Sequence, residues 1–284
     1  MTVLYECVHQ GERHFGLGSP EDSVLGLYPL GGTDLRGALL AAGGDTEAFI
    51  AAVTEGRTPV RVPAGDVTFR PPLLPESVGD AMVSGFMATH NVKVDDTTQT
   101  QPNWFFKGLG DVLKAPGEAL RAPAGSVALT EEAEVVLVYV TDEHRTPQYA
   151  GYTFGNDLTD IGRFKRHNGH LSYAKLCDAG VAPWLFLGTP PRHVTGHVTI
   201  ERDGSPAWEG TFTTGIKALH YGLRDMISGL FAHEALLHPG RVHYVYLGAD
   251  RSSFHSGFAM ADGDRVEMRF ETHGVRLSNP VSAP

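Results

Sequence analysis

Cysteine is scarce in this sequence, and its scarcity excludes two kinds of small, cross-linked protein. Cys7 and Cys177 are the only two cysteines, and they lie far apart in the chain. No C-x-x-C spacing is present, so the sequence indicates neither a disulfide framework nor a thiolate zinc site. We expect two unpaired and mostly buried thiols.

Long apolar runs are also missing. The longest runs, such as Val135–Val140 and Trp184–Leu187, are far shorter than the ~20 residues that a membrane-spanning helix needs. The N-terminus, MTVLYECVHQ, lacks the basic and then apolar pattern of a secretory signal. We therefore expect no membrane span and a cytoplasmic protein.

Positive charge is in deficit. The chain has 23 basic and 33 acidic residues, which gives a formal net charge of -10, and no basic cluster is longer than the short Arg163–Arg166 stretch. An acidic protein repels the phosphates of nucleic acids and of anionic membranes. The composition thus argues against nucleic acid and membrane surfaces as partners.

The composition is otherwise that of a folded, turn-rich protein. Hydrophobic residues make up 42% of the 284 residues and charged residues 20%, which is typical of globular proteins. The 34 glycines and 18 prolines separate many short apolar runs, and this alternation is typical of strands joined by frequent turns. At roughly 150 residues per domain, the length corresponds to about two domains.

The organisation changes along the chain. Apolar positions between Leu35 and Val53, interrupted by Gly43-Gly44, predict one or two short helices. Three prolines within Pro71–Pro75 mark a boundary, and after it only Gly222–Leu237 has a prominent helical pattern among strand-like segments. We predict an α+β, mainly β protein with a small N-terminal α+β domain (1–66) and a larger domain (67–284).

Three carboxylates are placed to bind a cation. Glu132 and Glu134 are two residues apart at the start of an apolar strand, so their side chains project from one face. Such a pair needs neutralising, and oxygen-only ligands favour a hard ion. Asp157 ends the strand-like GYTFGND, where Gly155 and Asn156 permit a bulge or turn that re-aims it. By spacing alone, solvated acids at strand ends remain the alternative.

A resemblance connects these segments. The motifs occur in this order: PNWFFKG (102–108), EEAEVVLVYV (131–140), AGYTFGNDLTD (150–160), LHPGRVHYVYLGAD (237–250) and DGDRVEMRFETHGVRLSNPV (262–281). Over roughly residues 67–281 the chain resembles the fumarylacetoacetate hydrolase superfamily, and GYTFGND is the most specific match. The resemblance implies a mixed β-roll catalytic domain, a homodimer, and one Mg²⁺, Mn²⁺ or Ca²⁺ ion held by Glu132, Glu134 and Asp157.

Two lysines match family positions. The well-known hydrolases carry K-S-F-D after the third ligand, whereas this chain has HLSYAKLCDAGVAP, which is more similar to the branch related to 2-keto-3-deoxy sugar-acid dehydratases. Lys175 matches the lysine of that branch, and Lys107 matches a P-x-x-F-x-K lysine of the wider family. Considered alone, Lys107 would be a surface residue. The resemblance implies that both ammonium groups bind a substrate carboxylate or stabilise an enolate.

His90 is the candidate base. It occupies the position where many hydrolases of the family have a histidine followed three residues later by a glutamate, a pair that activates water. Here Lys93 replaces the glutamate, so the pair is incomplete. His90 is either a base or a structural or substrate-contacting residue. The H-x-x-H spacing of His167 and His170 could bind zinc, but a surface loop is the simpler interpretation.

The resemblance implies a divalent-metal enzyme for a small 2-oxo or β-dicarbonyl acid, acting through a metal-bound enolate. Hydrolysis of a C–C bond is the commonest activity of the family and the first expectation. The alternatives are a dehydratase (lyase) of a 2-keto-3-deoxy sugar acid, an isomerase or a decarboxylase. Lys93, together with Ala249 where the family commonly has threonine, motivates another alternative, a non-catalytic homologue that binds a metal or ligand.

Overall fold

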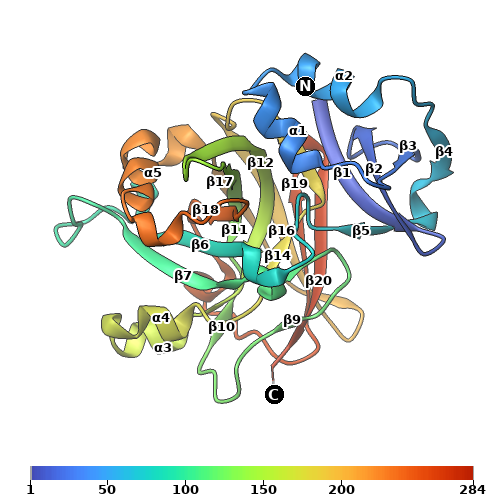
Figure 1. Ribbon diagram of the computed structural model, residues 1–284. Helices are drawn as coiled ribbons and strands as arrows, with labels where there is room; N and C mark the ends of the chain where they lie inside the picture. Colours follow the sequence, from blue (N-terminus) through green and yellow to red (C-terminus); the bar gives the residue numbers. More distant parts are fainter. Residues whose placement is uncertain (1, 284) are drawn as a thin grey trace.

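A computed structural model describes residues 2–283, and within them the chain folds into three sheets and five α-helices (Figure 1). The path of the large sheet follows the order β4 (Val60–Pro63), β3 (Val24–Pro29), β2 (Glu12–Gly18), β1 (Thr2–His9), β15 (Trp184–Leu187), β12 (Pro147–Asp157), β11 (Ala133–Thr141), β18 (Val242–Tyr246), β6 (Ala81–Met87) and β7 (Asn103–Leu109). Three short strands pair beside this path, namely β5 (Thr68–Arg70), β8 (Leu113–Lys114) and β14 (Ala179–Val181).

Two smaller sheets complete the β structure. The five-stranded sheet has the order β17 (Ser205–Thr214), β16 (Val194–Arg202), β19 (Arg265–Phe270), β20 (Val275–Ser282) and β9 (Leu120–Arg121). β10 (Leu129–Thr130) pairs with β13 (Thr159–Asp160). The helices are α1 (Leu35–Ala42), α2 (Thr46–Thr54), α3 (Ile161–Arg166), α4 (Leu171–Ala174) and α5 (Leu223–Phe231). The predicted α+β, mainly β fold is confirmed.

Strand β11 is buried on both faces, which explains its continuous apolar sequence. Its residues alternate between two cores. Val135 and Leu137 pack into a core shared with the five-stranded sheet, and Val136 and Val138 pack into a core on the other face. Phe270 of β19 stacks on Phe154 of β12 with ring centroids 4.4 Å apart, so the first core lies between the two sheets.

The N-terminal strands continue the large sheet. β1 pairs antiparallel with β15 from Thr2↔Leu187 to Tyr5↔Trp184. The two helices predicted near Leu35–Val53 are present, and α1 ends at Gly43, whose φ of 58° places it in the left-handed conformation of a helix C-cap. Whether residues 1–66 fold as a separate domain stays a prediction.

Two predictions about helices need correction. α5 covers only part of the predicted Gly222–Leu237, because the segment continues as a 3₁₀ turn, Glu234–Leu236. The segment after Asp157, predicted as a polar loop, contains α3 and α4, which lie beside each other below β7 in Figure 1. Both helices are too short for an apolar period to show in the sequence.

Two expectations about the whole chain can be compared with the structure. Both cysteines are free and buried, as predicted. Among residues 2–283, no helix combines the length and the apolar character that crossing a membrane requires.

Candidate metal centre

The register of two strands brings the three carboxylates together. In the β11–β12 ladder Glu134 pairs with Gly155, and the Asp157 N–H donates to the carbonyl oxygen of Glu132 at 3.0 Å. Gly155 is required here, because a Cβ would lie 2.6 Å from the ring of Tyr246. The register is regular at Gly155 and Asn156, so the bulge predicted there is wrong. The pairing of the two strands by itself directs the Asp157 side chain towards the two glutamates.

The carboxylates form a compact, buried group. Glu132, Glu134 and Asp157 each offer a ligand oxygen, and these oxygens all lie within 4.8 Å of one another. The three residues are 3%, 0% and 0% exposed. They are thus not the solvated acids of the alternative interpretation. Within the described chain they are also the one group of three His, Cys, Asp or Glu residues close enough to share an ion, and the exposed His167 and His170 belong to no such group.

Electrostatics at Glu134 favour a bound cation. Burial, together with the charges of Asp157 and Glu132, raises the pKa of Glu134 well above its ordinary value. Its Oε2 accepts a hydrogen bond from the Gly248 N–H at 2.6 Å, whereas its buried Oε1 has no hydrogen-bond partner among the described residues. A buried carboxylate with an unsatisfied oxygen between two other anions is a donor set that fits a hard divalent cation.

Lys175 is bonded to two of the three carboxylates. Its Nζ donates to Glu132 Oε2 and Asp157 Oδ2, both at 2.5 Å, and to Thr159 Oγ1 at 2.9 Å. Burial alone would lower the pKa of Lys175, but the carboxylates, with Asp157 first, outweigh burial and raise it. Lys175 is therefore a cation at neutral pH.

Lys107 is equally buried, so it is not the surface lysine that its sequence alone would indicate. The side chain is fully enclosed, and Nζ donates to Asp157 Oδ1 at 2.5 Å and to the Leu158 carbonyl oxygen at 2.8 Å. Asp157 therefore binds an ammonium group through each of its two oxygens. Both predicted lysines lie at the carboxylate group.

His90 lies nearby but is enclosed. Nδ1 is 3.1 Å from the hydroxyl of Thr89, and Nε2 is 2.9 Å from the hydroxyl of Thr214. Burial, and then the charge of Lys93, lower its pKa to about 4, so the ring is neutral at pH 7. With both nitrogens bonded and 1% exposure, the ring has no free nitrogen to present to a substrate.

Sequence reasoning missed a third buried glutamate in this segment, Glu131. Glu131 accepts from the N–H and hydroxyl of Ser253, at 2.8 and 2.5 Å, and burial raises its pKa to about 7. This pairing ties the 3₁₀ turn Ser253–Ser256 to the metal-site segment, and the turn carries His255, whose Nδ1 is 3.0 Å from Ser252 Oγ. The adjacent acids Glu131-Glu132 were the one signal in the sequence, but they do not identify a partner so far along the chain.

A cavity of ≈ 920 Å³ opens beside the carboxylates. Glu132 lines it, together with Lys93, Lys165 and His255. His90 is absent from the lining. This cavity is the place where a substrate would reach the metal site.

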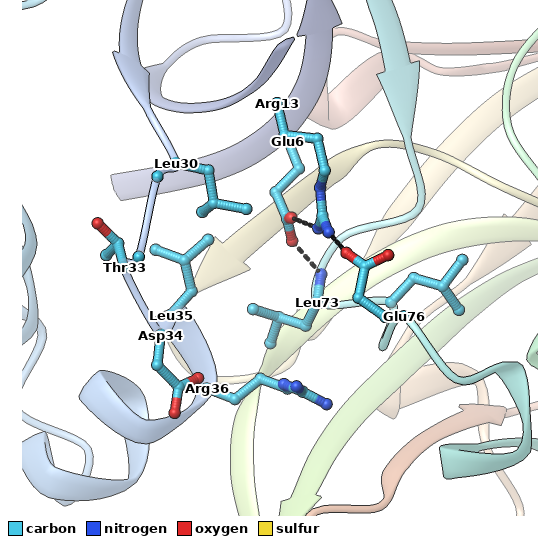
Figure 2. Close-up of a pocket in the computed structure, with 12 residues that line it drawn as sticks. Glu6, Arg13, Leu30, Thr33, Asp34, Leu35, Arg36, Leu73 and Glu76 are labelled. Atoms are coloured by element: carbon cyan, nitrogen blue, oxygen red, sulfur yellow. Dashed lines mark hydrogen bonds and ion pairs between the residues drawn. The ribbon is translucent and has the colours of Figure 1, made fainter.

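A second cavity, of ≈ 300 Å³, lies between the N-terminal strands, α1 and the proline-rich segment (Figure 2). Arg13 bridges Glu6 and Glu76 across it, and Glu6 also accepts from the N–H of Leu73. Because Arg13 is ion-paired with both glutamates, we interpret the group as a structural contact.

The structure is that of a β-rich protein with a buried group of carboxylates. The oxygen atoms of this group suit a divalent cation. A family model described as fumarylacetoacetate (FAA) hydrolase C-terminal matches residues 78–282. The chain therefore belongs to the fumarylacetoacetate hydrolase family and, with it, to a family of enzymes. The family predicted from the motifs is confirmed.

Solved structures share the fold over nearly the whole chain. A 2-keto-3-deoxy-D-arabinonate dehydratase in its apo form superposes with a TM-score of 0.68 at 17% identity, covering 99% of each chain. The same dehydratase complexed with magnesium and 2,5-dioxopentanoate has a TM-score of 0.67 at 18% identity, also over 99% of each chain. A 5-carboxymethyl-2-hydroxymuconate delta-isomerase from Mycobacterium smegmatis has a TM-score of 0.65 at 18% identity, covering 100% of each chain. A search of curated proteins gave no match.

Proposed function

We propose that the chain is a divalent-metal-dependent enzyme acting on a small 2-oxo acid through an enolate. The observation that carries the proposal is the buried group of Glu132, Glu134 and Asp157 with Lys175 bonded to two of its members. These carboxylates would hold Mg²⁺ or a similar ion. When bound, such an ion supplies Lewis acidity towards the 2-oxo group. Magnesium together with a 2-oxo acid in a dehydratase of the same fold supports this assignment.

The lysines would balance charge at the reacting atoms. A cationic Lys175 can stabilise negative charge that develops on the substrate oxygen, or donate a proton. Lys107, which bonds the other oxygen of Asp157, would keep that ligand oriented. Lys175 is therefore proposed as catalytic and Lys107 as a residue that acts through Asp157.

Dehydration of a 2-keto-3-deoxy sugar acid is the reaction that this geometry favours. In that reaction a base takes the proton from C3, negative charge passes to the 2-oxo oxygen, and the C4 hydroxyl takes up a proton and leaves as water. His255 lines the cavity, and burial lowers its pKa so that it is neutral at pH 7; it is the base that this site offers for the C3 proton. The site needs a cationic proton donor, which Lys175 provides. It needs no water-activating pair, which suits an enclosed His90 and a lysine at position 93.

Hydrolysis of a C–C bond, the first expectation from the sequence, stays a prediction. It requires a base that deprotonates water, and His90 would have to break its bond to Thr89 or Thr214 to serve. The imidazole that does line the cavity is His255. A homodimer, implied by the resemblance, likewise stays a prediction, and light scattering after gel filtration would test it.

Calorimetric titration with MgCl₂ tests the metal site. We expect one ion per chain for the wild type and at least tenfold weaker binding for Glu134→Gln, because one of three anionic ligands is lost. Glu143→Gln, which removes an exposed acid, is the matched control and should bind like the wild type. Equal affinity for Glu134→Gln and the wild type would refute the metal site.

Assays with 2-keto-3-deoxy-aldonates and with acylpyruvates, each with Mg²⁺ and with EDTA, test the reaction. We expect Mg²⁺-dependent loss of water from a 2-keto-3-deoxy-aldonate. Cleavage of acylpyruvates alone would establish hydrolysis instead. Turnover that survives EDTA would contradict the role of the ion in either reaction.

A further inference from the structure

We propose that Lys93 and Lys165 form a subsite for a second anionic group, so that the substrate is a 2-oxo acid carrying another carboxylate or a phosphate ester. This inference rests on the proposed function and deepens it, because it names the class of substrate. The 2-oxo acid end of the substrate would lie at the metal site formed by Glu132, Glu134 and Asp157. The second anionic group of the substrate would lie at the two lysines.

The two lysines reach one cavity from distant parts of the chain. Lys93 ends the 3₁₀ turn Asn91–Lys93 that follows β6, and Lys165 belongs to α3. Both line the cavity into which Glu132 opens. Within residues 2–283, neither ammonium group has a hydrogen bond or an ion pair. Two unneutralised cations on the wall of one cavity provide a place for an anion.

The field in this part of the cavity is positive. His255 lines the same cavity, and its pKa is lowered by burial and then by the charges of Lys93 and Lys165. Lys93 also contributes to the lowered pKa of His90. Both ammonium groups therefore act on the interior of the cavity rather than only on bulk solvent.

Two carboxylates that line the cavity oppose this field: Glu132, whose Oε2 accepts from Lys175, and Asp95. The Oδ1 of Asp95 is taken up by the N–H and the hydroxyl of Thr97, at 2.8 and 2.6 Å. In a chain of net charge -10, a cavity with two unpaired lysines attracts anions selectively.

Binding of matched 2-oxo acids to the Mg²⁺-loaded protein tests the subsite. The pairs are oxaloacetate with 2-oxobutyrate, 2-oxoglutarate with 2-oxopentanoate, and 2-keto-3-deoxygluconate 6-phosphate with 2-keto-3-deoxygluconate. Each pair keeps the 2-oxo acid and differs in the second anion, and the third pair distinguishes a phosphate from a carboxylate. Calorimetry at low salt should show at least tenfold tighter binding of the dianion in one or more pairs.

The variants assign that preference to the lysines. In the Lys93→Gln/Lys165→Gln protein, the ratio of the two Kd values should fall to about one, and high salt should reduce the wild-type ratio as well. Lys217→Gln removes an exposed lysine away from the cavity and should keep the wild-type ratio. An unchanged ratio in the double variant, or no preference in any wild-type pair, would overturn the subsite.

The same titrations separate this inference from the proposed function. If the wild type binds monoacids and dianions equally, the subsite alone is wrong. If none of the 2-oxo acids binds in the presence of Mg²⁺, the proposed function is wrong, and the subsite is wrong with it.

Discussion

At the scale of single residues, the site holds more negative than positive charge. Three carboxylates, Glu132, Glu134 and Asp157, lie against two ammonium groups, those of Lys107 and Lys175. Removing ions from water costs several kcal/mol per ion, and contacts between the ions regain only part of it. The third carboxylate, Glu134, has no ammonium group of its own, so its burial lowers the stability of the fold. The raised pKa of Glu134 has the same cause, because burial and the neighbouring anions disfavour its charged form. Such a group is explained by binding a cation, not by stabilising the fold.

Replacing Lys175 tests its part in the reaction. Lys175→Met should lower kcat/KM at least tenfold, about 1.4 kcal/mol of transition-state stabilisation. Affinity for Mg²⁺ should not weaken, because the ammonium group competes with a cation for Glu132 and Asp157. Steady-state kinetics and calorimetry measure the two effects, and Lys217→Met is the control. An unchanged kcat/KM would show that Lys175 serves only to neutralise its neighbours.

At the scale of elements, a charged contact holds the N-terminal strands to the rest of the chain. Glu6 of β1 is buried, and it accepts from Arg13 of β2 at 2.9 Å and from the Leu73 N–H at 2.7 Å (Figure 2). Leu73 has a φ of 61°, unusual for a residue with a side chain. The hydrogen bond to Glu6 therefore helps to keep the proline-rich segment in this conformation.

Removing Glu6 should loosen this junction. Glu6→Ala leaves the Leu73 N–H and part of the Arg13 charge without partners, so we expect the free energy of unfolding to fall by about 3 kcal/mol. Glu76→Ala, at the exposed partner of the same arginine, should cost less than about 1 kcal/mol. Urea unfolding followed by fluorescence measures both values. Equal effects of the two substitutions would contradict a special role of Glu6.

At the scale of the whole molecule, the β-rich topology buries polar groups that the chain must keep neutral. His243 of β18 is fully buried between strands. Its Nε2 is 3.1 Å from Thr141 Oγ1, and its Nδ1 has no hydrogen-bond partner among residues 2–283. Burial, and then the charge of Arg241, lower its pKa to about 4. Protonating this ring would place an unpaired charge inside the large sheet, so global stability should depend on pH.

Acid should therefore destabilise the protein through His243. Between its unfolded pKa of about 6.5 and its folded pKa of about 4, the unfolded chain binds a proton that the folded chain does not, so stability falls as the pH falls. The shift corresponds to about 3 kcal/mol across that window. Urea unfolding at pH 7 and pH 4 measures the loss of stability for the wild type and for His243→Gln. The loss between the two pH values should be smaller in the variant, by about 3 kcal/mol. Parallel pH profiles for the two proteins would contradict this assignment.

The sequence by itself determined the features that short stretches of residues encode. The apolar run of β11, the helices separated by Gly43 and the mainly β class follow from local period and turn residues. The family motifs placed Glu132, Glu134, Asp157 and the two lysines in one site, which spacing alone left open.

Only the tertiary structure decided the contacts between segments distant in the chain. Thr214 encloses His90, Ser253 binds Glu131, and Lys165 meets Lys93 at one cavity. Strand register and the placing of 3₁₀ turns create these contacts, and they result from packing across the whole molecule. No pattern within a window of sequence encodes them, because each depends on which strands become neighbours.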